Sequence, residues 1–171
     1  EYIFAFDNIR DSRIVEKKLE LIRKHTDKIP KFYVFCGFNH DEPDTYPEGF
    51  WENDIADVFE RVRVLISHQA LPYIMRYADY KRSPYRGMYD TIARYCNQPS
   101  FIKKKSFREY CFDTVGQNNA APKYAEQFER GNPAVLAGMS GIELAHRVIN
   151  KIYKEKELPP PSFSDDKSPE Y

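Results

Sequence analysis

Cysteine is scarce in this sequence, and its few copies lie far apart. Cys36, Cys96 and Cys111 are the only three among 171 residues, an odd, scattered set that argues against a disulfide framework and for a reducing compartment. No apolar run approaches the roughly 20 residues that cross a bilayer, and the first residues lack the pattern of a signal peptide. We therefore expect a cytoplasmic protein without a membrane partner.

An excess of charge of one sign is also missing. The 26 basic residues balance the 26 acidic ones, which removes the electrostatic case for a nucleic-acid partner. Tyrosines and cations interleave between Tyr73 and Tyr89, so nucleic-acid binding stays an alternative that the charge balance opposes. The loop that begins at His40 holds several carboxylates but no second histidine, and we predict no metal site there.

The first half of the chain alternates between apolar runs and helical stripes. Residues 2–6 are a continuous apolar run, typical of a strand covered on both faces, and residues 32–36 and 71–75 predict two more strands. Between them, apolar side chains recur every three or four residues over 12–25 and 55–66, which predicts amphipathic helices. This order predicts parallel β/α units with right-handed crossovers.

The second half is predicted to be helical and irregular. Residues 86–96 and 106–112 each predict a helix, and Ser140 and Glu143 have capping-box spacing ahead of a last amphipathic stretch. Three consecutive prolines follow Leu158, and the polar residues after them predict an extended tail.

Five short segments carry a resemblance to a known family. They are Phe-Ala-Phe-Asp at 4–7, Tyr-Val-Phe-Cys-Gly-Phe-Asn at 33–39, Pro-Tyr-Ile-Met-Arg-Tyr at 72–77, Ala-Arg-Tyr-Cys-Asn-Gln-Pro at 93–99 and Ser-Phe-Arg-Glu-Tyr at 106–110. In this order and spacing they resemble the later strands of radical-SAM family proteins, over about residues 2–112. The resemblance implies an α/β fold: a partial parallel β/α barrel of about three strands with outer helices over 1–112. A helical C-terminal extension over 113–157 and a Pro-rich polar tail over 158–171 would follow.

The resemblance also implies an activity that this chain should not perform alone. Radical-SAM enzymes cleave S-adenosylmethionine reductively at a 4Fe-4S cluster and then take a hydrogen atom from a substrate, here an unknown small molecule or peptide. Their cluster sits on a Cys-x-x-x-Cys-x-x-Cys loop, which this chain lacks, so we expect no cluster in it. Because the chain opens directly on an apolar strand without an initiator Met, we expect a fragment that begins after the cluster-binding strands.

Parallel β/α folds bind ligands at the carboxyl ends of their strands, and this rule selects the candidate site. By resemblance, a carboxylate there would hold the ribose of S-adenosylmethionine, and backbone at the next strand's end would lie against the adenine. The predicted cofactor-binding residues are Asp7, Asn8, Gly37 and Asn39, and the predicted substrate-binding residues are Arg76 and Tyr77.

These residues also have ordinary structural interpretations. Asp7 could cap a helix or accept loop amides, and Gly37 could serve only as a turn glycine. Asn39 could make an Asx-turn, and Arg76 could neutralise an internal acid. The sequence leaves these alternatives open.

A different class of function remains beside the enzyme fragment: a non-catalytic binding or assembly module built on the same half-barrel. A sheet cut from a barrel has an open edge where its missing neighbour would pair. The first predicted strand is apolar, so we expect a homodimer through this edge, pairing with the missing part of the barrel, or a cover over the edge by the segment after Phe112.

Overall fold

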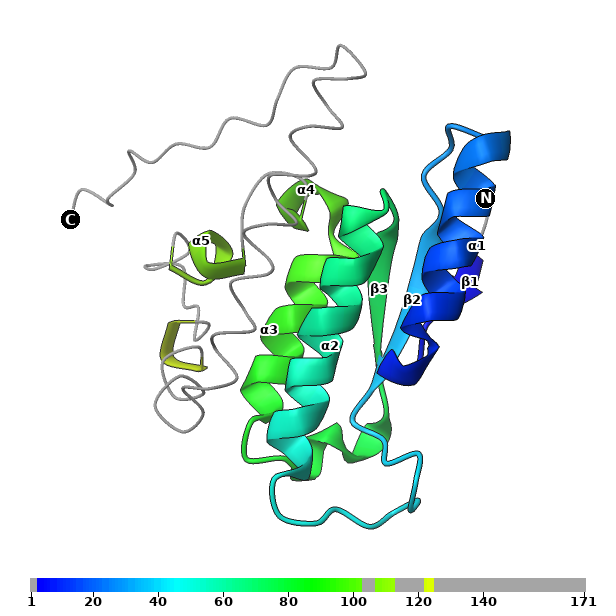
Figure 1. Ribbon diagram of the computed structural model, residues 1–171. Coiled ribbons are helices and arrows are strands. Elements are labelled where there is room, and N and C mark those ends of the chain that lie inside the picture. The colour runs from blue at the N-terminus through cyan, green and yellow to red at the C-terminus, as the bar shows by residue number, and fades with distance from the viewer. Residues whose placement is uncertain (1–2, 103–106, 113–121, 125–171) are drawn as a thin grey trace, which may run out of the picture.

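The computed structural model describes residues 3–102, 107–112 and 122–124. Three strands, β1 (Ile3–Ala5), β2 (Lys31–Cys36) and β3 (Leu71–Arg76), form one parallel sheet in the order β1-β2-β3. Helix α1 (Ser12–His25) connects β1 to β2, α2 (Phe50–Ser67) connects β2 to β3, and α3 (Arg86–Asn97) follows β3 (Figure 1). The predicted parallel β/α units are confirmed.

Short elements complete the described part of the chain. The 3-10 helices η1 (Ile9–Asp11) and η2 (Ala78–Arg82) follow the carboxyl ends of β1 and β3. Helices α4 (Pro99–Ile102) and α5 (Phe107–Phe112) follow α3. The bounds of α5 differ by one residue from those of the helix predicted over 106–112. Apart from 122–124, the predicted extension over 113–157 and the tail over 158–171 lie outside the described residues. Within the described ranges, no helix combines the length and the apolar character that crossing a membrane requires.

Helix α2 supplies much of the core. Its predicted apolar stripe packs against β2 and β3, and six of its side chains are at most 2% exposed: Ile55, Val58, Phe59, Val62, Leu65 and Ile66. Helix α1 adds Val15 and Leu19, whereas Ile14, which the sequence placed in the same stripe, is 56% exposed. The core therefore lies between the sheet and the helices on one side of it.

In the part of the chain that the structure describes, the sheet is covered on one face. Alternate residues of β2, namely Phe32, Val34 and Cys36, are buried, and the residues between them are only partly so. The register puts three large side chains on the other face with 39–43% exposure: Ile3, Tyr73 and Met75. The expectation that the first strand would be covered on both faces was wrong, because the described helices pack on the same side.

Candidate functional site

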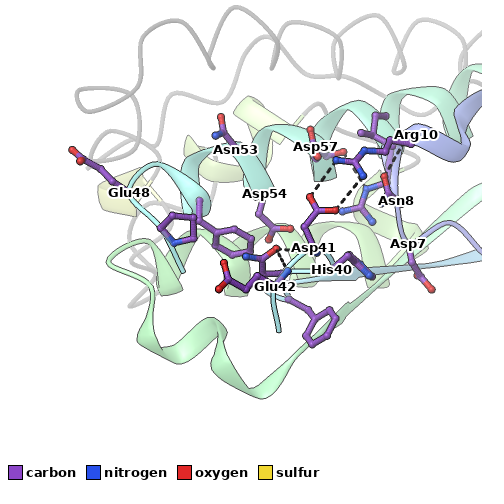
Figure 2. A pocket seen from close by; sticks show the side chains of 16 residues that line it. Asp7, Asn8, Arg10, His40, Asp41, Glu42, Glu48, Asn53, Asp54 and Asp57 are labelled. Atoms are coloured by element: carbon purple, nitrogen blue, oxygen red, sulfur yellow. Dashed lines mark hydrogen bonds and ion pairs between the residues drawn. The ribbon is translucent and has the colours of Figure 1, made fainter. Parts of the chain in front are cut away.

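A cavity of about 510 Å³ opens at the carboxyl ends of β1 and β2 (Figure 2). Residues of the β1–α1 turn, of the loop between β2 and α2, and of α2 as far as Arg61 line it. Its volume falls among those of small-molecule sites, roughly 300–1,000 Å³. Of the six predicted site residues, Asp7, Asn8 and Asn39 line this cavity, whereas Gly37, Arg76 and Tyr77 lie outside its described walls.

Asp7 joins the ends of two strands. Its Oδ1 accepts a hydrogen bond of 3.2 Å from the backbone N–H of Phe35, and within the described residues no hydrogen bond reaches Oδ2. Figure 2 shows its carboxylate extending away from Asp54 and Asp57 of α2. The cap of η1 is instead Asn8, whose Oδ1 accepts from the Arg10 amide at 2.9 Å. One carboxylate oxygen of Asp7 is therefore not used in a hydrogen bond by the described residues.

Arg61 of α2 is a charged residue in the core, with 2% exposure. Its Nη1 donates to the carbonyls of Phe6 (3.0 Å) and Phe35 (2.8 Å), and its Nε donates to the Asp57 carbonyl at 3.3 Å. Burial lowers the pKa of Arg61, while the nearby Asp54 opposes this shift. The guanidinium stays charged in proteins, so these carbonyls take the place of water around it.

Asp54, two helical turns earlier on α2, binds the end of β2. Its Oδ2 accepts from the Gly37 backbone N–H at 2.8 Å and from the Tyr89 hydroxyl at 2.7 Å. Burial raises the pKa of Asp54, and these two hydrogen bonds together with the Arg61 charge oppose the rise. Because Asp54 takes the Gly37 amide, that amide is not free to bind an adenine.

Asn39 shapes the loop between β2 and α2. Its Nδ2 donates to the Thr45 carbonyl at 2.8 Å, and its Oδ1 accepts from the amides of Asp41 and Glu42. The same loop is tied to η1 by an exposed ion pair between Asp41 and Arg10. Both functional groups of the Asn39 side chain are thus used within the protein, as the Asx-turn interpretation expected.

An aromatic cluster of Phe35, Phe38, His40 and Tyr77 lies at the carboxyl ends of β2 and β3. The rings contact one another edge-on or tilted, with centroids 5.0–6.3 Å apart. The strand alternation places Phe35 and Tyr77 on the uncovered face of the sheet, the face to which Asp7 also belongs. The predicted residue Tyr77 therefore lies at the carboxyl ends of the strands, as part of the aromatic cluster.

Arg76 turns to the helical side of the sheet. Its Nη1 forms an ion pair with Asp90 of α3, and its guanidinium lies 4.8 Å from the centre of the Tyr80 ring. The pair is partly exposed, with 33% exposure for Arg76 and 38% for Asp90. Asp90 is thus the kind of internal acidic partner for Arg76 that the sequence left open as the alternative to a ligand.

The three cysteines do not fit a four-iron cluster. Cys36 in β2, Cys96 in α3 and Cys111 in α5 are all buried and free, and burial raises the pKa of each thiol. They come from separate elements, whereas cluster ligands share a short loop. The described residues also contain no group of three or more histidine, cysteine or carboxylate side chains that could hold a metal ion.

Sequence reasoning missed Asp54, Arg61 and the aromatic cluster. A signal for the first two was present: Asp54 and Arg61 fall on the same side of α2 as Val58 and Leu65, within an apolar stripe. A charge at such a position needs an internal partner. No comparable signal marks the aromatic cluster, because its members come together only in the folded sheet.

Comparison of the chain with protein-family models, with curated proteins and with solved structures finds no match. The chemistry of this site is therefore inferred from its own residues alone.

Proposed function

We propose that this chain forms part of the rim that binds S-adenosylmethionine in a larger radical-SAM type enzyme, and that it is inactive alone. The observation that carries the proposal is the position of Asp7 beside the aromatic cluster, at the carboxyl end of the parallel sheet and on its uncovered face. Three consecutive parallel strands with helices on one face have the arrangement of a partial β/α barrel, whose inner face would be the uncovered one.

Asp7 and the aromatic cluster suit the two parts of a nucleoside. A carboxylate oxygen accepts hydrogen bonds from ribose hydroxyls, and hydrogen bonds to a charged group contribute about 1.5–3 kcal/mol. Aromatic rings offer a stacking surface for adenine, which contributes about 1–3 kcal/mol per base. Asp7 is linked to the cluster through the Phe35 amide, so one ligand can contact both.

The residues of this chain would bind and orient the cofactor. Reductive cleavage is the chemistry of S-adenosylmethionine and of an iron-sulfur cluster that the cysteines of this chain do not fit. The substrate, a small molecule or a peptide, would contact the same rim.

Isothermal titration of the chain with S-adenosylmethionine tests the proposal. We expect saturable binding, and Asp7→Asn should weaken it about tenfold because the asparagine loses the charge of the hydrogen-bond acceptor. Asparagine keeps an oxygen for the Phe35 amide, so the fold should be retained. Asp11→Asn, which changes an exposed carboxylate of η1, should bind like the wild type.

A pair of nucleosides separates the ribose from the base. Wild-type protein should bind adenosine more tightly than 2′,3′-dideoxyadenosine, which lacks both hydroxyls, and Asp7→Asn should lose this preference. Absence of saturable binding, or an equal loss of affinity in Asp11→Asn, would contradict the proposed function.

One observation favours the assembly module as a second candidate. The uncovered face of the sheet exposes Ile3, Tyr73 and Met75, and the described residues place no strand beside the outer edge of β1. Apolar surface of this kind commonly marks contact with another protein. Its partner would be a second copy of the chain or the remainder of a barrel.

A further inference from the structure

We propose that Arg61 and Asp54 are positioning residues, which hold the carboxyl ends of β1 and β2 apart and thereby orient Asp7 for its ligand. The consequence for ligand binding rests on the function proposed above for Asp7. The hydrogen-bond arrangement itself does not depend on that function.

The backbone ladder between β1 and β2 stops one rung early. The Phe6 amide still donates to the Tyr33 carbonyl at 2.8 Å, as in a regular parallel pair. In such a pair, the next hydrogen bond would join the Phe35 amide to the Phe6 carbonyl. Here the Phe35 amide donates to Asp7 Oδ1, and the Phe6 carbonyl accepts from Arg61 Nη1. Two side chains have replaced one rung.

Arg61 binds two backbone carbonyls that would otherwise accept hydrogen bonds from backbone amides of the neighbouring strand. The same Nη1 that binds the Phe6 carbonyl also binds that of Phe35. Without this donor, the buried Phe6 carbonyl and the partly buried Phe35 carbonyl would lack a partner, and the Phe35 amide could satisfy the Phe6 carbonyl by donating to it. That return would release Asp7 from the hydrogen bond that orients it.

Asp54 acts at the next backbone amide along the chain that faces β1, just after the end of β2. This amide belongs to Gly37, and it donates to Asp54 Oδ2, which the Tyr89 hydroxyl also binds. Residues seven apart on a helix point in directions about 20° from each other, so Asp54 and Arg61 project from one side of α2. Helix α2 therefore places two opposite charges at the point where the backbones of β1 and β2 separate.

Through-hydrogen-bond NMR couplings report the partner of the Phe35 amide directly. In the wild-type chain, its nitrogen should couple to the side-chain carboxyl carbon of Asp7. In Arg61→Met, the coupling should move to the backbone carbonyl carbon of Phe6, and the affinity for S-adenosylmethionine should fall about tenfold. Arg63→Met is the matched control, because Arg63 lies on the same helix but pairs with Glu60 at the surface. It should change neither the coupling nor the affinity.

Arg61→Lys provides a second variant if Arg61→Met does not fold. The lysine side chain is one atom too short to place its nitrogen at the Nη1 position, although it keeps the positive charge. We therefore expect the Phe35 amide to change its partner from Asp7 to Phe6 in this variant as well. A Phe35 amide that stays coupled to Asp7 in a folded variant overturns the proposal. A changed partner with wild-type affinity overturns its link to the ligand. If the wild-type chain does not bind S-adenosylmethionine, the proposed function fails, and the coupling still decides whether Arg61 positions Asp7.

Discussion

At the scale of single residues, Gly37 is the position at which β2 ends and the rim begins. Its φ is +76°, in the left-handed region that glycine tolerates and other residues rarely adopt. A Cβ atom added there would lie 2.9 Å from the Cβ of Tyr80. Both its conformation and its surroundings therefore require glycine, and its amide in turn holds Asp54.

Gly37→Ala should lower the free energy of unfolding by about 2–4 kcal/mol. The left-handed conformation accounts for roughly 1–2 kcal/mol, and the contact with Tyr80 adds a cost of overpacking, since a Cβ atom cannot rotate away. Gly49→Ala is the control: φ is +79°, but the nearest atom is Asn53 Nδ2 at 3.8 Å, so about 1–2 kcal/mol is expected. Urea denaturation measures both, and equal losses would show that the Tyr80 contact relaxes freely.

Arg76→Ala should have a small effect, because the ion pair with Asp90 is partly exposed to water. We expect a loss of about 1 kcal/mol in stability, as for surface pairs, in place of the 3–5 kcal/mol that breaking a buried pair costs. The affinity for S-adenosylmethionine should stay within about twofold, a change of less than 1 kcal/mol. Thermal melting and ligand titration test both statements, with Arg82→Ala, which removes a similar pair to Asp79, as the control. A tenfold loss of affinity in Arg76→Ala alone would place Arg76 at the ligand.

The rim residues also show how far a sequence can define a site. The rule that ligands bind at strand ends selected Asp7, and the structure places it at the cavity. Its hydrogen bond to Phe35 joins residues 28 positions apart, which no local pattern encodes. For Arg61, the charge within an apolar stripe signalled an internal partner, but the stripe could not identify the carbonyls of Phe6 and Phe35, which lie far away in the sequence.

At the scale of elements, periodicity predicted most of the order. The helix over 12–25 has the observed bounds of α1, and the apolar stripe over 55–66 lies within α2, because such repeats are local properties of the chain. The coverage of the sheet is not local. Strands with apolar side chains on both faces look alike whether or not a second layer covers them, so the uncovered face at Tyr73 and Met75 could not be predicted.

At the scale of the whole molecule, the two edges of the sheet differ. On the outer side of β3, Pro72 has no N–H to offer, and the side-chain amide of Asn97 binds both the N–H and the carbonyl of Ile74, at 2.6 and 3.0 Å. This edge resists pairing with another strand. The edge of β1 has no such protection among the described residues, and it adjoins the apolar face at Ile3.

This asymmetry makes β1 the expected contact in a homodimer. We expect sedimentation velocity at micromolar concentration to show twice the mass of one chain, because exposed edges of apolar strands pair unless they are covered. A lysine at Phe4 would be a poor test, since that ring packs 5.1 Å from Phe32 and its loss would damage the fold. Ile3→Lys puts a charge at an exposed position of the edge strand itself and should yield a monomer.

Ile14→Lys is the matched control for this experiment. Ile14 is 56% exposed and lies on helix α1, not on a strand, so its replacement should leave the dimer intact. If Ile14→Lys also gives monomers, the chains associate through non-specific contacts of apolar surface and not through the β1 edge. If the wild-type chain is itself a monodisperse monomer and the amides of Ile3 and Ala5 exchange rapidly with solvent, the β1 edge needs no partner. That result would contradict both the homodimer and a cover over the edge by the segment after Phe112, because in each of them these two amides are hydrogen-bonded and protected.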